Sequence, residues 1–172
     1  MSEPFTLYKL IVLYMLKKID FALTNSQISD FILEQGYTTY FTLQSVLSEL
    51  SDSGLVRQET IRNSSHYTIT SEGEETLRFF ENRISRTIRD DIDRYLKENK
   101  MKLRNEVSVL ADYYRNTTNE FNVRCRVKEK YSDLIDLTLT VPDENQAKAI
   151  CQQWDKKCQM VYEYIMKELM QD

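Results

Sequence analysis

The 172-residue sequence contains little of what usually interrupts or cross-links a chain: three glycines, two prolines and three cysteines. Phosphate-cradling loops and dinucleotide-binding fingerprints need several closely spaced glycines, so the scarcity of glycine argues against both. An odd number of cysteines without paired spacing argues against a disulfide framework and favours reduced thiols. We therefore expect a cytoplasmic protein.

Long hydrophobic runs and an excess of positive charge are also missing. The longest apolar run, residues 10–16, is far shorter than the roughly 20 residues that cross a bilayer. It also lacks the features of a secretory signal, so we expect a buried helix here and no membrane association. The formal net charge of -4 argues against avid, sequence-independent binding to nucleic acid, because that binding scales with the phosphates neutralised by Lys and Arg.

Residues suited to catalysis or metal binding do not form a recognisable group. His66 is the only histidine and has no nucleophile or carboxylate at suggestive spacing. Cys125 lies on the apolar side of a strand pattern, whereas Cys151 and Cys158 share the apolar stripe of a helix pattern. Such positions favour core packing over a redox switch or a soft-metal site. We predict that the protein is not an enzyme and holds no cofactor or metal ion.

The N-terminal part of the sequence predicts three helices. Apolar residues recur at helical spacing over residues 5–18. Thr24 and Gln27 have the spacing of a capping box at the start of a second helix. The third helix is expected over residues 40–53, with Gly54 as its left-handed cap.

A β-hairpin and a long helix are predicted next. Two alternating segments around a turn at residues 63–65 predict a hairpin over residues 57–68. Ser71 with Glu74 is a second capping-box candidate, and apolar residues then continue at helical spacing to about Lys100. This spacing predicts one uninterrupted helix that has a single apolar stripe and is otherwise exposed to solvent.

The C-terminal part predicts a small sheet and a final helix. Apolar and polar residues alternate in three segments, which predicts an antiparallel meander with strands at 107–113, 121–127 and 135–141. Asp143 caps a last helix over residues 143–170. The expected fold class is α+β, with a first domain over residues 1–72 and a second, for dimerisation or regulation, over residues 73–172.

Two short pieces carry a resemblance to a known family. The piece LSELSDSGLV, followed by HYTITSEG after the hairpin turn, resembles bacterial winged helix-turn-helix transcriptional regulators of the multiple-antibiotic-resistance and phenolic-acid-repressor types. The matching positions are Leu50, Gly54, Leu55, Tyr67, Ile69, Thr70 and Gly73. The whole chain, with its TTYFTLQ segment, resembles an uncharacterised bacterial winged-helix family of similar length. The resemblance to the named regulators covers residues 5–75 and implies a DNA-binding regulator.

The third predicted helix has one face that suits DNA bases. At 100° per residue, the apolar residues Leu43, Val46, Leu47 and Leu50 form a buried seam, and uncharged polar and aromatic residues lie opposite. Gln44 can pair with adenine, serine hydroxyls with several bases, and Phe41 can press against a thymine methyl group. Phe41 and Tyr40 can equally pack against the hairpin or a neighbouring subunit. The predicted DNA-contacting residues are Thr39, Tyr40, Phe41, Thr42, Gln44, Ser45, Ser48, Arg57, Arg62, Asn63, Ser64, Ser65 and His66.

Because this face has no positive charge, phosphate contacts must come from elsewhere. Candidates are Lys17 and Lys18, the hairpin arginines and backbone amides at helix N-termini. Arginines at 83, 86 and 89 can touch DNA flanking the hairpin, or can form ordinary i to i+4 and intersubunit pairs with Asp90, Asp93 and Glu81. We expect a homodimer through the C-terminal half, because two copies double the contacts to double-stranded DNA.

The sequence therefore supports two functions. The first is a sequence-specific DNA-binding transcriptional regulator that reads the major groove with the helix at 40–53 and contacts the backbone with the hairpin at 57–68. The alternative is a winged-helix protein–protein interaction module without direct DNA binding, to which the acidic balance and the surface aromatic residue are equally suited. Either can include a small-molecule effector bound to the C-terminal sheet, although no group of residues specifies one.

Overall fold

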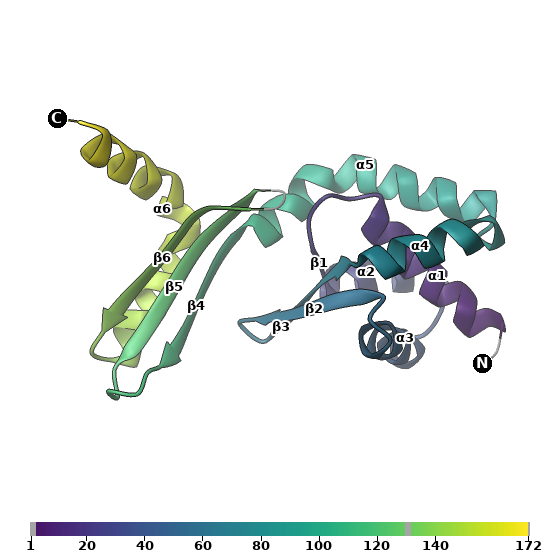
Figure 1. Cartoon of the computed structure of the whole chain (residues 1–172), viewed down its shortest axis with the longest axis horizontal. Helices are drawn as coiled ribbons and strands as arrows, with labels where there is room; N and C mark the ends of the chain where they lie inside the picture. Colours follow the sequence, from purple (N-terminus) through teal and green to yellow (C-terminus); the bar gives the residue numbers. More distant parts are fainter. Residues whose placement is uncertain (1–2, 130–131, 172) are drawn as a thin grey trace. The chain divides into compact units, whose positions relative to one another are not determined.

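The computed structural model describes residues 3–129 and 132–171 and divides the chain into two compact units, residues 1–104 (unit 1) and 105–172 (unit 2). Within the described ranges the fold is α+β, with six α-helices and two three-stranded antiparallel sheets (Figure 1). The division lies inside the fifth helix and not after residue 72, the predicted boundary. The reason is that Ile92, Leu96 and Leu103 are buried in the core of unit 1.

Unit 1 contains the predicted three helices and hairpin, followed by helical segments. Its elements are α1 (Glu3–Lys17), β1 (Leu23–Thr24), α2 (Asn25–Gln35), α3 (Tyr40–Asp52), β2 (Val56–Ile61), β3 (Ser64–Ile69), α4 (Ser71–Phe80), a 3-10 turn η1 (Glu81–Arg83) and α5 (Arg86–Ser108). The predicted capping box at Thr24 and Gln27 is confirmed. The sheet order is β1-β3-β2, and β1 was not predicted because two residues are too few to show an alternating pattern.

The predicted single helix from Ser71 to Lys100 is wrong. It is interrupted after α4 by η1 and by Ile84, whose backbone is extended (φ -82°, ψ 125°). The interruption places Ile84 fully inside the core, and the Ser85 hydroxyl caps the new helix by accepting a hydrogen bond from Ile88 N at 3.2 Å. Burial of Ile84 and a fresh N-cap thus replace the backbone hydrogen bonds that a continuous helix would have kept.

The hairpin turn is one residue tighter than predicted. Arg62 and Asn63 both have positive φ, 49° and 64°, as a two-residue type I′ turn requires. Ser64 and Ser65, expected in the turn, belong to β3. Asn63 tolerates the left-handed conformation better than most residues, which explains why the chain reverses at this point.

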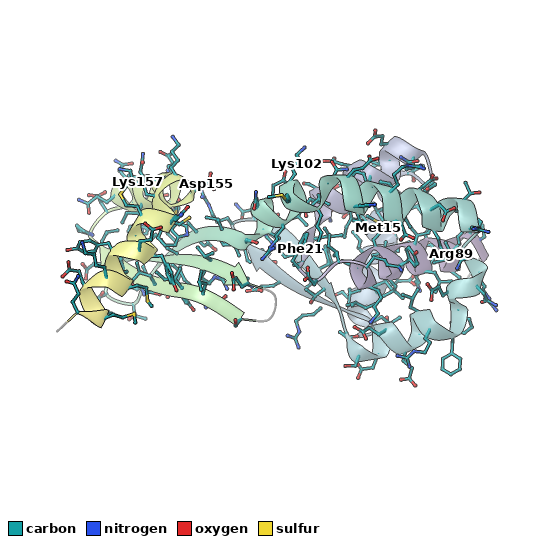
Figure 2. The ribbon with its side chains drawn as sticks, turned by 90° about the horizontal axis from the view of Figure 1, so that it is seen from above. Met15, Phe21, Arg89, Lys102, Asp155 and Lys157 are labelled. Carbon is teal, nitrogen blue, oxygen red and sulfur yellow. The ribbon has the colours of Figure 1, made fainter. Side chains whose placement is uncertain are left out.

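The core of unit 1 is built around α1. All seven residues from Leu10 to Leu16 are buried, as expected for the longest apolar run. Helices α3 and α4 and strand β3 pack against α1. In Figure 2, Met15 lies among the elements of unit 1, whereas Lys102 projects from α5 into solvent.

Unit 2 is the predicted meander covered by the last helix. Its strands are β4 (Val109–Arg115), β5 (Phe121–Glu129) and β6 (Ser132–Val141), in the order β4-β5-β6, followed by α6 (Glu144–Met170). The first strand begins two residues later than predicted because α5 continues to Ser108. Helix α6 crosses one face of the sheet (Figure 1), and Trp154 is buried there, donating a hydrogen bond from Nε1 to the Arg126 carbonyl oxygen at 3.1 Å.

Thr70 and Gly73 join the hairpin of unit 1 to α4. The Thr70 hydroxyl donates to the Gly54 carbonyl oxygen at 2.7 Å and accepts from Gly73 N at 3.1 Å. Gly73 is buried, and a Cβ atom at this position would collide with the Leu55 carbonyl oxygen. Gly54, Thr70 and Gly73 therefore have a packing role in this fold.

We expect Gly73→Ala to lower the free energy of unfolding by about 1 to 3 kcal/mol, because the added methyl group would collide with the Leu55 backbone carbonyl oxygen, which cannot move aside as the end of a flexible side chain can. Urea denaturation followed by far-UV circular dichroism measures the loss. Glu75→Ala, at an exposed position of the same helix, is the control and should change stability by less than about 0.5 kcal/mol. Equal stability of the two variants would contradict the packing argument.

Candidate nucleic-acid interface

Helix α3 lies at the edge of unit 1, on the side opposite α5 (Figure 1). Thr39 caps it by accepting a hydrogen bond from Thr42 N at 3.3 Å. The predicted seam is confirmed: its buried residues are Leu43, Val46, Leu47 and Leu50. Because these residues pack inward, the opposite side of α3 is presented to solvent.

Two aromatic residues begin the exposed side of α3. Phe41 is 84% exposed and Tyr40 is 50% exposed. Their rings meet edge to face, with centroids 6.0 Å apart and planes at 79°. Packing against the hairpin was one of the two alternatives to DNA contact for Phe41, and this exposure rules it out. A side chain of this size so fully in water indicates a contact outside the chain.

The hydroxyl and amide residues of α3 differ in their availability. Ser45 and Ser48 are exposed, whereas Gln44 is half-buried. Asn25 Nδ2 donates to Gln44 Oε1 at 2.7 Å, and Gln44 Nε2 donates back to Asn25 Oδ1 at 3.0 Å. Ser29 Oγ also donates to Asn25 Oδ1, at 2.9 Å. Gln44 thus connects α3 to α2, and base reading would require it to give up both bonds to Asn25.

Asn25 was not predicted from the sequence to contact α3. It is the first residue of α2, next to the Thr24 cap, and its side chain reaches residue 44 across the fold. Hydrophobic periodicity contains no signal for a polar pair between two helices. The two amide residues lie nineteen positions apart in the sequence. They could have been predicted to meet only if the packing of the two helices had been known beforehand.

The hairpin contributes an exposed tip and a buried base. Arg57, Arg62 and Asn63 are exposed, whereas Ser64 and Ser65 are half-buried. Ser65 Oγ accepts a hydrogen bond from Gln58 Nε2 at 3.0 Å.

His66, one of the predicted DNA-contacting residues, is only 6% exposed. It lies in the central strand β3, opposite Thr24 of β1 and Glu59 of β2. With β1 and β2 on its two sides, β3 is an interior strand, and the His66 side chain is buried within the fold. His66 is excluded from the set that could touch a duplex.

The lysines of α1, and Lys18 directly after it, are engaged within the chain. Lys9 Nζ lies 2.6 Å from Glu49 Oε2, and Lys17 Nζ lies 3.2 Å from Glu74 Oε2. Lys18 lies over the Tyr14 ring, with Nζ 5.2 Å from the centroid. The pair with Lys9 offsets the Glu49 carboxylate, the acidic group at the flank of α3. Lys17 is a weaker candidate for phosphate contact than the sequence suggested, because it must leave Glu74.

The arginines near the α4–α5 junction make local contacts. Arg86 forms the expected ion pair with Asp90, with Nε 4.0 Å from Oδ2 and both side chains well exposed, so the pair adds little stability. Arg83 stacks on Phe80, its guanidinium carbon 4.9 Å from the ring centroid. Neither contact depends on a nucleic acid.

Two tyrosine–aspartate pairs fix α5 against the rest of unit 1. Tyr14 donates to Asp93 Oδ1 at 2.8 Å, and Tyr37 donates to Asp91 Oδ2 at 2.9 Å. Burial, followed by these hydrogen bonds, holds the pKa of both tyrosines well above the usual range. Both phenols therefore stay protonated donors, and Tyr37 holds the loop between α2 and α3.

The three thiols belong to unit 2. Cys125 and Cys151 are buried and Cys158 is half-buried. Burial, with a smaller effect of Cys151, raises the pKa of Cys125 to about 11, which leaves it an unreactive thiol at neutral pH. Among the described residues, no group of three or more His, Cys, Asp or Glu side chains could hold a metal ion, and no helix is long and apolar enough to cross a membrane.

We expect a double-mutant cycle on Asn25→Ala and Gln44→Ala to give a coupling energy of about 1 kcal/mol in unfolding free energy, because the two amides bond each other reciprocally. Urea denaturation of the two single variants and the double variant measures it. Replacing Asn25 and Ser48 instead provides the control, since Ser48 is exposed, and these changes should be additive. Additivity in the Asn25 and Gln44 pair would show that the amide contact does not hold α3.

Comparison with known proteins places this chain in a family. No curated protein and no solved structure matches it. The matching family is described as "Domain of unknown function (DUF4364)", and that description assigns no chemistry to the exposed side of α3. The match extends over residues 8–169, nearly the whole chain, and the protein belongs to the DUF4364 family.

Proposed function

We propose that the protein is a sequence-specific DNA-binding transcriptional regulator. In this proposal unit 1 acts as a winged helix: α3 enters the major groove and the β2–β3 hairpin contacts the phosphate backbone. The order of three helices followed by a two-stranded hairpin supports it, as does the one-sided exposure of α3. The observation that carries most weight is Phe41, an aromatic side chain 84% exposed on that helix.

The chemistry of the exposed side of α3 suits base edges. Ser45 and Ser48 can donate and accept hydrogen bonds, and Phe41 offers apolar contact to a thymine methyl group. The Tyr40 ring meets the Phe41 ring edge to face, so the two rings form one exposed aromatic surface. Gln44 has the lesser role of orienting α3 through Asn25.

Phosphate contacts would come mainly from the hairpin. Arg57 on β2, Arg62 in the turn and the adjacent Asn63 are all exposed. The Lys9–Glu49 pair helps, because it offsets a carboxylate that would otherwise repel the backbone beside α3. Few cations imply weak binding to bulk DNA, so most of the discrimination must arise from contacts to bases.

We expect Phe41→Ala to weaken binding to the preferred duplex by about tenfold to a hundredfold, as loss of a base contact worth about 1 to 3 kcal/mol implies. The preferred duplex is first selected from a random pool with the purified full chain, and affinities are then measured by fluorescence anisotropy. The fold should be unaffected because the side chain is almost fully in water.

Phe79→Ala is the matched control, since Phe79 is 74% exposed on α4 and has no part in the proposed interface. Its affinity should equal that of the wild type. Equal affinities for Phe41→Ala and Phe79→Ala, or a pool from which no sequence is enriched, would remove the basis of the proposal.

A second candidate, a protein-interaction module, is favoured by one specific observation. The Tyr40–Phe41 pair is exposed, while Lys9 and Lys17 are already engaged by Glu49 and Glu74. Salt dependence separates the two functions. Binding to DNA should weaken steeply with salt, with a logarithmic slope of about -0.9 for each phosphate neutralised. If a protein partner is recovered in place of DNA, and its affinity hardly changes with salt, the second candidate is favoured.

A further inference from the structure

The outer edge of β6 in unit 2 has no partner strand within the described part of the chain. The sheet order β4-β5-β6 gives β6 a single neighbour, β5, over its ten residues Ser132–Val141. A row of backbone N–H and C=O groups on the other side of β6 is therefore left to solvent. Such edges readily pair with another strand unless they are protected.

Strand β6 has few of the usual protections of an edge strand. It contains no lysine, arginine or proline, and the register irregularity with β5 occurs between Val127 and Lys128, near one end. Its central charge, Asp136, is held by Arg124 in a two-pronged pair, with Nε–Oδ1 at 2.9 Å and Nη2–Oδ2 at 2.7 Å. The hydrogen bonds from Arg124 lower the pKa of Asp136. A carboxylate offset in this way repels an approaching strand less than a free one.

The apolar face of β6 is also incompletely covered. Helix α6 packs mainly on β4 and β5 and less on β6. As a result Ile135, Leu137 and Val141 are only half-buried, and Leu139 is 41% exposed. The same unit exposes further apolar residues along α6, namely Met160, Tyr164, Met166, Leu169 and Met170.

We propose that β6 pairs antiparallel with β6 of a second copy of this chain. A two-fold axis perpendicular to the sheet then joins the two meanders into one continuous six-stranded sheet, with both α6 helices on the same face. Main-chain hydrogen bonds provide the attraction, and alternate side chains set the register. This inference goes beyond the proposed DNA binding and does not depend on it.

The residues of β6 suit a copy of themselves. Antiparallel pairing about Leu137 places Leu137 opposite Leu137, Ile135 opposite Leu139 and Asp136 opposite Thr138. The apolar residues then meet on one face, and each Asp136 carboxylate faces a Thr138 hydroxyl. Pairing about Thr138 preserves the same separation of faces. Pairing about Asp136 is disfavoured because it sets two carboxylates directly against each other.

The other edge of the sheet is a poorer candidate. Strand β4 has seven residues against ten in β6, and it includes the charges of Asp112 and Arg115. A paired length of nine residues in β6, from 133 to 141, spans about 30 Å at the usual strand rise. Both strands contain two charged residues, Asp133 and Asp136 in the case of β6, so it is the greater length of β6 that offers more backbone bonds to a second copy.

The first test is the oligomeric state of the full chain in the absence of DNA, measured by sedimentation equilibrium. We expect a dimer for the wild type and at least a tenfold weaker association for Leu139→Lys, which puts a charge in the paired row at an already exposed position. Tyr114→Lys, on β4 and 53% exposed, is the matched control and should remain dimeric. A monomeric wild type at up to about 100 μM, far above the dissociation constants of stable homodimers, or a dimer unaffected by Leu139→Lys, would overturn the inference.

The second test is cross-linking. The two favoured registers place the Thr138 side chains of the two copies opposite each other or two residues apart, about 5 to 8 Å between Cβ atoms. In a Cys158→Ser background, which removes the more accessible native thiol, Thr138→Cys should form a disulfide-linked dimer on mild oxidation, and Tyr114→Cys should not. Linking through position 114 alone would place the interface at β4 and refute the assignment. Neither test uses DNA. A failure of the proposed β6 pairing therefore does not affect the Phe41 prediction, which is tested separately.

Discussion

The arrangement of unit 1 depends on one constraint, the burial of α1 along a whole stretch of its length. Leu10–Leu16 are enclosed on all sides, so the elements around α1 must each present an apolar face to it. For α3 that face is the seam from Leu43 to Leu50, and once it is fixed the residues half a turn away have to point to solvent. The exposure of Phe41 therefore follows from the packing of the opposite side of the same helix. No local strain or special backbone is needed to present it.

Local signals allowed much of the fold to be predicted. The caps at Thr24 and Asp143 satisfy backbone N–H groups within three residues, so the sequence alone contains both partners. Alternation along β5 and β6 persists over enough residues to identify strands. The break before α5 was not predictable in this way, because Ile84 fits the spacing of a continuous helix as well as it fits the core. Only the tertiary packing favours the interrupted form.

The candidate site was predicted less completely than the fold, and the reason is the range of the interactions. Ser45 and Ser48 face solvent as their helical positions require, since helix periodicity alone decides it. His66 is buried in the central strand of a sheet whose edge strand β1 comes more than forty positions earlier in the chain. Gln44 is occupied by Asn25 on another helix. Whether a polar residue is exposed or hydrogen-bonded depends on which distant segment of the chain packs against it. No pattern in a single sequence encodes that.

Under the proposed function, an acidic chain that reads DNA must compensate for few phosphate contacts, and the proposed pairing through β6 provides a physical means. Each copy of α3 offers only a small group of uncharged side chains, worth about 1 to 3 kcal/mol per good contact with a base. Linking two such groups turns the second binding event into an intramolecular one and raises the overall affinity without any further positive charge. This gain is lost when the protein concentration is below the dissociation constant of the dimer. The free energy of DNA binding must then also supply the cost of bringing the two copies together. Under these two proposals, affinity for a two-site duplex is steeply concentration-dependent, whereas affinity for a single half-site is not.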